Sequence, residues 1–139
     1  MTPETLFSAF SAFVLIGWLA LVVAPLRRDL AVTAARWVVV ILCGGYVALL
    51  VTGLAGDGPP AGAGFDTLEG VRLLLSSPQA LLAGWVHYLA FDLFVGSWIG
   101  ADAPAARVPH WLVLPCLVLT FLAGPTGLLL YFTIKAARR

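Results

Sequence analysis

Four long apolar stretches constrain the fold of this chain more than any other feature. They cover residues 6–24, 37–55, 80–100 and 111–134, and nearly all acidic and basic side chains lie outside them or at their edges. About 20 helical residues cross the ~30 Å hydrocarbon core of a bilayer. The pattern therefore predicts an all-α, integral membrane four-helix bundle that forms a single transmembrane domain over residues 1–139.

The composition supports a membrane location. Of the 139 residues, 61% are hydrophobic and only 11% are charged, with a formal net charge of +1. An ordinary soluble domain has about 25% charged residues. The hydrophobicity excludes intrinsic disorder, and the lack of a basic face or large basic cluster argues against a nucleic-acid partner. We therefore expect an integral membrane protein whose helices contact membrane lipids.

The connection between the second and third stretches is the only long one. Its first half is rich in Gly, Pro and Ala and indicates a loop. Its second half, residues 65–76, places Leu68, Val71 and Leu75 at helical spacing opposite Asp66, which predicts a short amphipathic helix in the membrane interface. A simple surface helix and a lid that dips into the bundle are the alternatives.

The basic residues give conflicting indications about orientation in the membrane. Three arginines within residues 27–36 favour a cytoplasmic first connection, with both termini outside, under the positive-inside rule. Four crossings, however, place the basic residues of the tail, within residues 135–139, on that outer side. We give the first connection more weight because the first helix usually dominates orientation.

Two ionisable side chains lie well inside the apolar stretches, and both belong to the third. They are His87 and Asp92. A carboxylate at the centre of a membrane helix costs about 2.5–3.5 kcal/mol on insertion scales, so such a group is a candidate functional residue. The alternatives are a protonated Asp92 that only specifies helix packing and a hydrogen-bonded core histidine. On a helix the two lie about 140° apart and do not share one face, whereas Tyr88 stacks with Asp92.

The fourth stretch contains residues that weaken a helix. Pro115 lies in its first half, and Gly-Pro-Thr-Gly follows at residues 124–127. Proline removes a backbone donor and bends a helix. At membrane depth the freed carbonyl groups need partners from the protein or a polar cavity, and Asp92, Tyr88 and His87 are the candidates. A packing kink without a site is the alternative.

These two stretches carry motifs that resemble a known family. The third contains His87-x-x-x-x-Asp92-Leu-Phe, and the fourth contains Thr120-Phe-x-x-Gly-Pro-x-Gly. With them the chain resembles the ABA4-like (abscisic-acid-deficient-4-like) family of small four-span membrane proteins, over roughly residues 6–135. It looks like the shorter bacterial branch, which implies a location in the bacterial inner membrane.

The resemblance implies a function in xanthophyll chemistry. Plant members of the family are tied to the conversion of violaxanthin to neoxanthin, which is an epoxide-opening isomerisation. The implied activity is a cofactor-independent isomerase that acts on a carotenoid, xanthophyll or related isoprenoid epoxide. Because the oxidation state does not change, no redox cofactor is expected, and with two histidines no multi-histidine metal site is expected.

The residues suit acid–base chemistry of this kind. Protonation of the epoxide oxygen needs an acid, and formation of the allene needs a base for the proton on the adjacent carbon. We expect Asp92 to act as the acid, His87 to act as the base and Tyr88 to provide an orienting hydrogen bond. The roles of acid and base could also be reversed between Asp92 and His87. The expected substrate-binding residues, which would form walls for a rod-like polyene, are Trp85, Phe91, Phe94, Thr120, Phe121 and Pro125.

A non-catalytic role is the main alternative. A small bundle with one acidic side chain would equally serve as a pigment- or lipid-binding protein, or as an assembly subunit of another membrane enzyme. A proton pathway is less favoured, because relays need a chain of ionisable groups. Glycine pairs such as Gly84 and Gly96 also permit close contacts between helices, within one chain or in a homo-oligomer.

Overall fold

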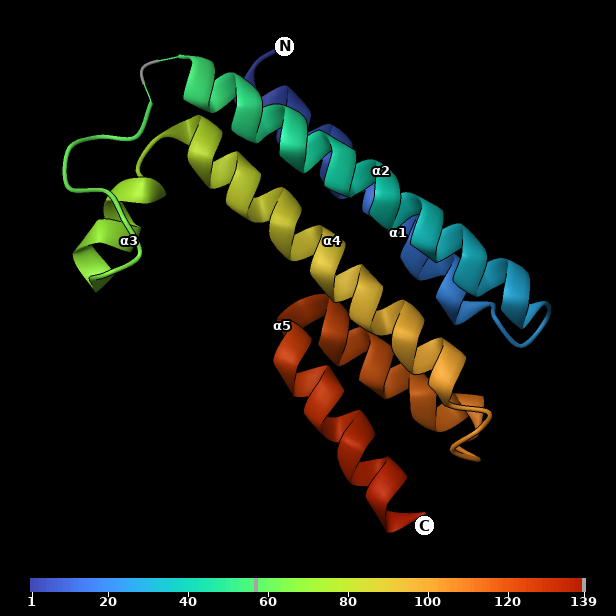
Figure 1. Cartoon of the computed structure of the whole chain (residues 1–139). Helices are drawn as coiled ribbons and strands as arrows, with labels where there is room; N and C mark the ends of the chain where they lie inside the picture. The colour runs from blue at the N-terminus through green and yellow to red at the C-terminus, as the bar shows by residue number, and fades with distance from the viewer. Residues whose placement is uncertain (57, 139) are drawn as a thin grey trace.

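The chain folds into helices joined by short connections and one long loop (Figure 1). The computed structural model describes residues 1–56 and 58–138. Four of the helices are long and apolar enough to cross a membrane, which confirms the expected all-α bundle. The elements are α1 (Pro3–Val22), α2 (Arg28–Ala55), α3 (Leu68–Leu74), α4 (Pro78–Asp102) and α5 (His110–Ala137).

Side-chain caps begin two of the membrane helices. The Thr2 hydroxyl accepts a hydrogen bond from the Thr5 N–H, and the Ser77 hydroxyl accepts one from the Ala80 N–H. In each case a proline follows the cap at the first helical position, where its missing N–H has no intrahelical partner to lose. These local signals account for the start of α1 and of α4.

Helix α2 begins earlier than the predicted second span. The expected stretch starts at residue 37, whereas α2 starts at Arg28. Charged side chains mark the end of the apolar stretch, but they do not end the helix. An acidic residue such as Asp29 is favourable in the first turn of a helix. The first connection is therefore shorter than the sequence suggested.

Helix α4 forms the centre of the bundle. It packs against α1, α2 and α5, and its Val86, Leu93 and Ile99 side chains are fully buried. Close approach to α1 depends on a glycine: a Cβ added at Gly96 would lie 2.7 Å from the Trp18 ring. The opposite faces of the outer helices expose aliphatic side chains, as expected where lipid replaces water.

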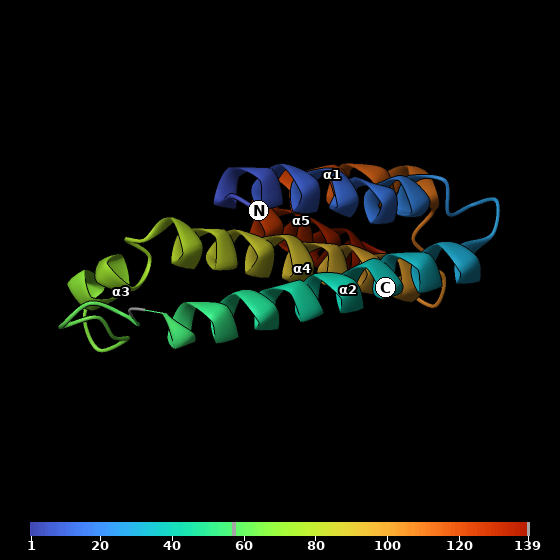
Figure 2. The same cartoon turned by 90° about the horizontal axis from the view of Figure 1, so that it is seen from above.

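Helix α5 covers the predicted fourth span, but it does not run straight. Its backbone leaves the helical conformation at Ala123 (φ −158°, ψ 72°), and the second half runs back beside the first (Figures 1 and 2). A Cβ at Gly127 would overlap Thr120 and the Cys116 carbonyl, although these residues lie two and three turns apart along a straight helix. The element is a helical hairpin whose tip lies at mid-height of α4.

The hairpin returns the end of α5 to the end of α4. The Lys135 Nζ atom lies 2.6 Å from Asp102 Oδ2, and Arg138 Nε donates to the Arg107 carbonyl at 3.2 Å. Figure 1 shows the C-terminus at the same end of the bundle as the α1–α2 connection. The basic residues of the first connection and of the tail therefore gather at one end, which removes the conflict in orientation that four straight crossings created.

Helix α3 confirms the expected short helix but is shorter than residues 65–76. It begins after Thr67, whose hydroxyl accepts from the Gly70 N–H at 2.9 Å, so Phe65 precedes it. Phe65 and Leu68 are each 88% exposed, as expected for apolar side chains that face a membrane interface. The Arg72 guanidinium, paired with Glu69, lowers the pKa of that exposed carboxyl.

Candidate functional site

The tip of the α5 hairpin meets α4 at Tyr88. The Tyr88 hydroxyl donates a hydrogen bond to the Leu122 carbonyl at 3.1 Å. Leu122 directly precedes the break at Ala123, where the helical hydrogen-bond pattern is interrupted. Of the three candidates to meet the carbonyl groups at the break, which were Asp92, Tyr88 and His87, Tyr88 makes such a contact, and this contact anchors the tip to the central helix.

Asp92 lies one turn further along the same face of α4. Its carboxyl group fills the space that a side chain at Gly124 would occupy, since a Cβ there would overlap the carboxylate. The hairpin tip therefore closes over Asp92 only because position 124 is a glycine.

One oxygen of this carboxyl group has no hydrogen-bond partner within residues 1–56 and 58–138. Asp92 Oδ2 is buried and makes no hydrogen bond to any of the described residues. Leaving a buried polar group unsatisfied costs about 1–3 kcal/mol. A structural aspartate would be expected to use both oxygens, so this atom is a point at which a polar group of a ligand would gain a hydrogen bond.

His87 faces a different part of the bundle. Its ring stacks on Phe91, with centroids 4.5 Å apart, and lies 5.5 Å from the ring of Tyr46 on α2. The residue is exposed at the outer surface of α4. The structure thus directs Asp92 towards α5 and His87 towards α2, as the angle between them on a helix requires. It does not bring the two side chains together.

An apolar groove lies between the N-terminal halves of α1 and α4. It has a volume of about 630 Å³. Because α5 turns back at Ala123, it does not cover this part of α4. Tyr88 is the last residue along α4 that lines the groove, so the residue that holds the hairpin tip also contributes to the groove wall. Its larger apolar lining residues are Phe7, Leu75, Leu81, Leu82 and Trp85.

Trp85 is held in place within the groove. Its indole Nε1 donates to the Ser11 hydroxyl at 2.9 Å, which ties α4 to α1. Its ring stacks on Tyr88 at 5.4 Å and contacts Phe7 at the same centroid distance. Three aromatic rings thus form one continuous wall that leads to the Tyr88 hydroxyl.

The other expected binding residues lie outside the groove. Phe91 and Phe94 are exposed on α4. The Thr120 hydroxyl is buried and donates to the Cys116 carbonyl at 2.7 Å, and Phe121 packs edge-on against Trp18. Pro125 is exposed beside the hairpin tip. Of the six residues, Trp85 alone is among those that line the groove.

Sequence reasoning missed residues that only the tertiary structure brings together. Phe7 and Leu75 lie on segments remote in sequence, and neither carries a polar signal. The contact between Asp102 and the end of α5 was also missed: Tyr131 and Lys135 both hydrogen-bond Asp102 Oδ2, at 2.5 and 2.6 Å. A straight α5 would have placed Lys135 at the opposite end of the bundle.

Comparisons with known proteins give one match. No curated protein and no solved structure matches the chain. A model of the family described as ABA DEFICIENT 4-like matches residues 5–131, which is nearly the whole chain and includes α4 and most of α5. The chain belongs to the ABA4-like family of proteins.

Proposed function

We propose that this membrane protein is a cofactor-independent isomerase that opens an epoxide on a carotenoid or related isoprenoid. The observation that carries the proposal is the buried Asp92 Oδ2 atom beside the hairpin tip, which has no hydrogen-bond partner in the part of the chain that the structure describes. Asp92 lies one turn beyond Tyr88, which lines an apolar groove. Membership in the ABA4-like family supports the substrate class.

The groove suits an apolar substrate with one polar end. Its volume of about 630 Å³ lies within the range of ~300–1,000 Å³ typical of small-molecule sites. The aromatic wall of Phe7, Trp85 and Tyr88 would pack against a ring end group and the first part of a polyene. The Tyr88 hydroxyl is then a polar group that an epoxide oxygen can meet, and Glu4 and Ser8 of α1 also line the groove.

The reaction needs one proton donated to the substrate and one proton removed from it. Protonated Asp92 donates its proton to the epoxide oxygen as the carbon–oxygen bond breaks. Tyr88 orients that oxygen by a hydrogen bond, for which its hydroxyl proton turns from the Leu122 carbonyl to the substrate. The carboxylate so formed takes the proton from the adjacent carbon as the new double bond forms. Atoms and electrons balance, and Asp92 returns to its starting state. His87 as the base remains the competing assignment.

Pigment analysis in a bacterial host that makes epoxy-carotenoids tests this proposal. Wild-type protein should convert the epoxide into an isomer of unchanged mass, and Asp92→Asn should stop the conversion. Asp66→Asn, the same change in an exposed loop residue, is the control. His87→Ala should retain conversion if Asp92 performs both transfers. Full activity of Asp92→Asn would overturn the assigned role.

A binding role is the second candidate. The observation in its favour is that Asp92 and His87 face different helices, so the groove is not flanked by an acid–base pair. In that case wild-type protein would co-purify with unaltered pigment. Trp85→Ala would lose the pigment, whereas Asp92→Asn would keep it.

A further inference from the structure

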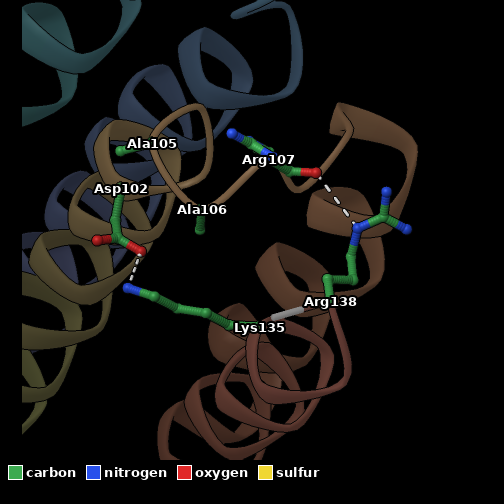
Figure 3. Close-up of a pocket in the computed structure, with 6 residues that line it drawn as sticks. All are labelled: Asp102, Ala105, Ala106, Arg107, Lys135 and Arg138. Carbon is green, nitrogen blue, oxygen red and sulfur yellow. Dashed lines mark hydrogen bonds and ion pairs between the residues drawn. The ribbon is translucent and has the colours of Figure 1, made fainter.

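A second pocket lies at the end of the bundle where α4 stops and α5 both begins and ends. It has a volume of about 390 Å³. Its walls come from the last residue of α4, the α4–α5 connection and the last turns of α5 (Figure 3). The pocket exists only because α5 folds back. Its lining residues are Asp102, Ala105, Ala106, Arg107, Lys135 and Arg138.

The charges around this pocket are unbalanced. Three basic side chains and one acidic side chain line it, which leaves a net charge of +2 (three positive minus one negative). Lys135 is paired with Asp102 at 2.6 Å. Within residues 1–56 and 58–138, Arg107 and Arg138 form no ion pair. The excess positive charge therefore resides on these two guanidinium groups.

The two arginines are joined through the backbone. Arg138 Nε donates to the Arg107 carbonyl at 3.2 Å, as Figure 3 shows. This contact uses one donor of Arg138 and leaves its two terminal nitrogen atoms available. Both side chains are exposed, so each can adjust its guanidinium group to a bound anion.

Arg107 holds an unusual backbone conformation. Its φ of +55° lies in the left-handed region, which glycine and asparagine adopt more easily than arginine does. Glycine would fit this turn with less strain. What arginine adds at the position is its charged side chain at the rim of the pocket.

We propose that this pocket binds a phosphate group, carried by an anionic phospholipid headgroup or present as free phosphate. A planar guanidinium group matches two phosphate oxygens at once. In Figure 3 the side chains of Arg107 and Arg138 point in different directions, so a clamp on one anion would need these exposed side chains to turn towards it. The pocket lies at the end of the bundle, where lipid headgroups meet the protein. Exposed Leu129 and Phe132, on the second half of α5, offer apolar contacts for the acyl chain of a lipid held there.

A phosphate at this position would stabilise the hairpin. It would join Arg107 on the α4–α5 connection to Arg138 at the end of α5, next to the contact between Lys135 and Asp102. Any ligand that binds the folded state better than the unfolded state raises the unfolding temperature. We therefore expect phosphate-bearing ligands to stabilise the protein more than neutral ligands do.

Native mass spectrometry of the full-length protein in nonionic detergent tests the proposal. The protein is titrated with phosphatidylglycerol and with phosphatidylcholine that carry the same acyl chains. Wild type should bind one phosphatidylglycerol about tenfold more tightly or better, since charge-assisted hydrogen bonds of this kind contribute that much or more. In a second arm, inorganic phosphate replaces chloride at matched ionic strength, and the unfolding temperature is measured.

Paired variants separate the pocket from general attraction between opposite charges. Arg107→Gly with Arg138→Gln should remove the preference for phosphatidylglycerol. Arg36→Gln, a change of an exposed arginine on α2, should alter the affinity by less than about twofold at physiological salt. Arg107→Gly alone should weaken binding without lowering the unfolding temperature of the lipid-free protein, because glycine tolerates the turn. That result separates lost binding from lost folding.

Each outcome decides the question. Stabilisation of wild type by inorganic phosphate, without selective lipid binding, would assign the pocket to a soluble phosphate. Selective binding of phosphatidylglycerol would assign it to a headgroup. An equal loss in Arg36→Gln would overturn the proposal. So would wild-type protein that neither prefers phosphatidylglycerol over zwitterionic phosphatidylcholine nor is stabilised by inorganic phosphate.

Discussion

Two aspartates of helix α4 face helix α5 but differ in the hydrogen bonds that their carboxyl groups make. Asp102 accepts hydrogen bonds from Tyr131 and Lys135 on one of its oxygens. Asp92 faces Gly124 at the hairpin tip, and its Oδ2 atom is buried without a partner among the described residues. The first carboxylate stabilises the return of α5 to the end of α4. The second is costly to the fold, which is typical of a group retained for function.

The largest expected effect is a difference in isomerase activity between a variant of Asp92 and the same variant of Asp102. Asp92→Asn should reduce isomerisation by about 10²-fold or more, the usual contribution of a general acid or base. Asp102→Asn should retain the activity of each folded molecule, because Asp102 lies away from the groove. The measurement is product formed per amount of folded protein. Equal losses in both variants would remove the distinction.

The next effect concerns the fit of Asp92 against Gly124. Gly124→Ala should destabilise the protein by about 1–3 kcal/mol, because the added methyl group overlaps the Asp92 carboxylate. Asp92→Ala makes room, so the double variant should recover part of that loss. A double-mutant cycle in detergent measures the coupling. Strict additivity would show that the two positions do not meet.

A smaller effect is expected from the contact at Asp102. Lys135→Met should lower the free energy of unfolding by about 1 kcal/mol, since both partners remain about a quarter exposed to solvent and screening reduces the interaction. Met keeps an unbranched apolar side chain at this position but also loses the contact of the Lys135 ammonium group with the Trp98 ring, 5.8 Å from its centroid. Chemical unfolding monitored by Trp fluorescence would measure it. A loss as large as that of Gly124→Ala would contradict this ranking.

The smallest effect is expected at the exposed pair on α3. Arg72 lowers the pKa of Glu69, so this pair contributes stability above the ordinary glutamate pKa and loses it as the pH falls through the lowered value. Because Glu69 is fully exposed, Glu69→Gln should shift the unfolding temperature very little at neutral pH. A thermal scan at neutral and acidic pH measures the shift. A large shift at neutral pH would show that α3 is docked more firmly than its exposure indicates.

The positions of the helices could be predicted because charges avoid hydrocarbon. Almost every charge marks the edge of an apolar stretch, so the four long helices followed from the sequence. The start of α2 at Arg28 did not follow from the sequence, because charged side chains end an apolar stretch without ending the helix. Likewise, the spacing of Tyr88 and Asp92 placed them on one face, and the structure directs that face towards α5.

The path of α5 could not be predicted from local signals. Gly-Pro-Thr-Gly at residues 124–127 indicated a weak point but gave no direction for the chain beyond it. The direction depends on the close contact of Gly127 with Thr120 and on the contact of Lys135 with Asp102. Both are tertiary interactions that exist only in the folded hairpin. The groove at Phe7 and Trp85 was unpredictable for the same reason, since it lies where α5 is absent.

The location of the two termini tests this account most directly, because the folded-back α5 exposes the groove and brings the break to Asp92. Reporter fusions at either end of the chain would place the termini relative to the membrane. Because α5 folds back, we expect the chain to cross three times although four helices are long and apolar enough to span, and we expect the basic end to face the cytoplasm. We expect an external N-terminus and a cytoplasmic C-terminus. Both termini on the same side would show a fourth crossing and contradict this account.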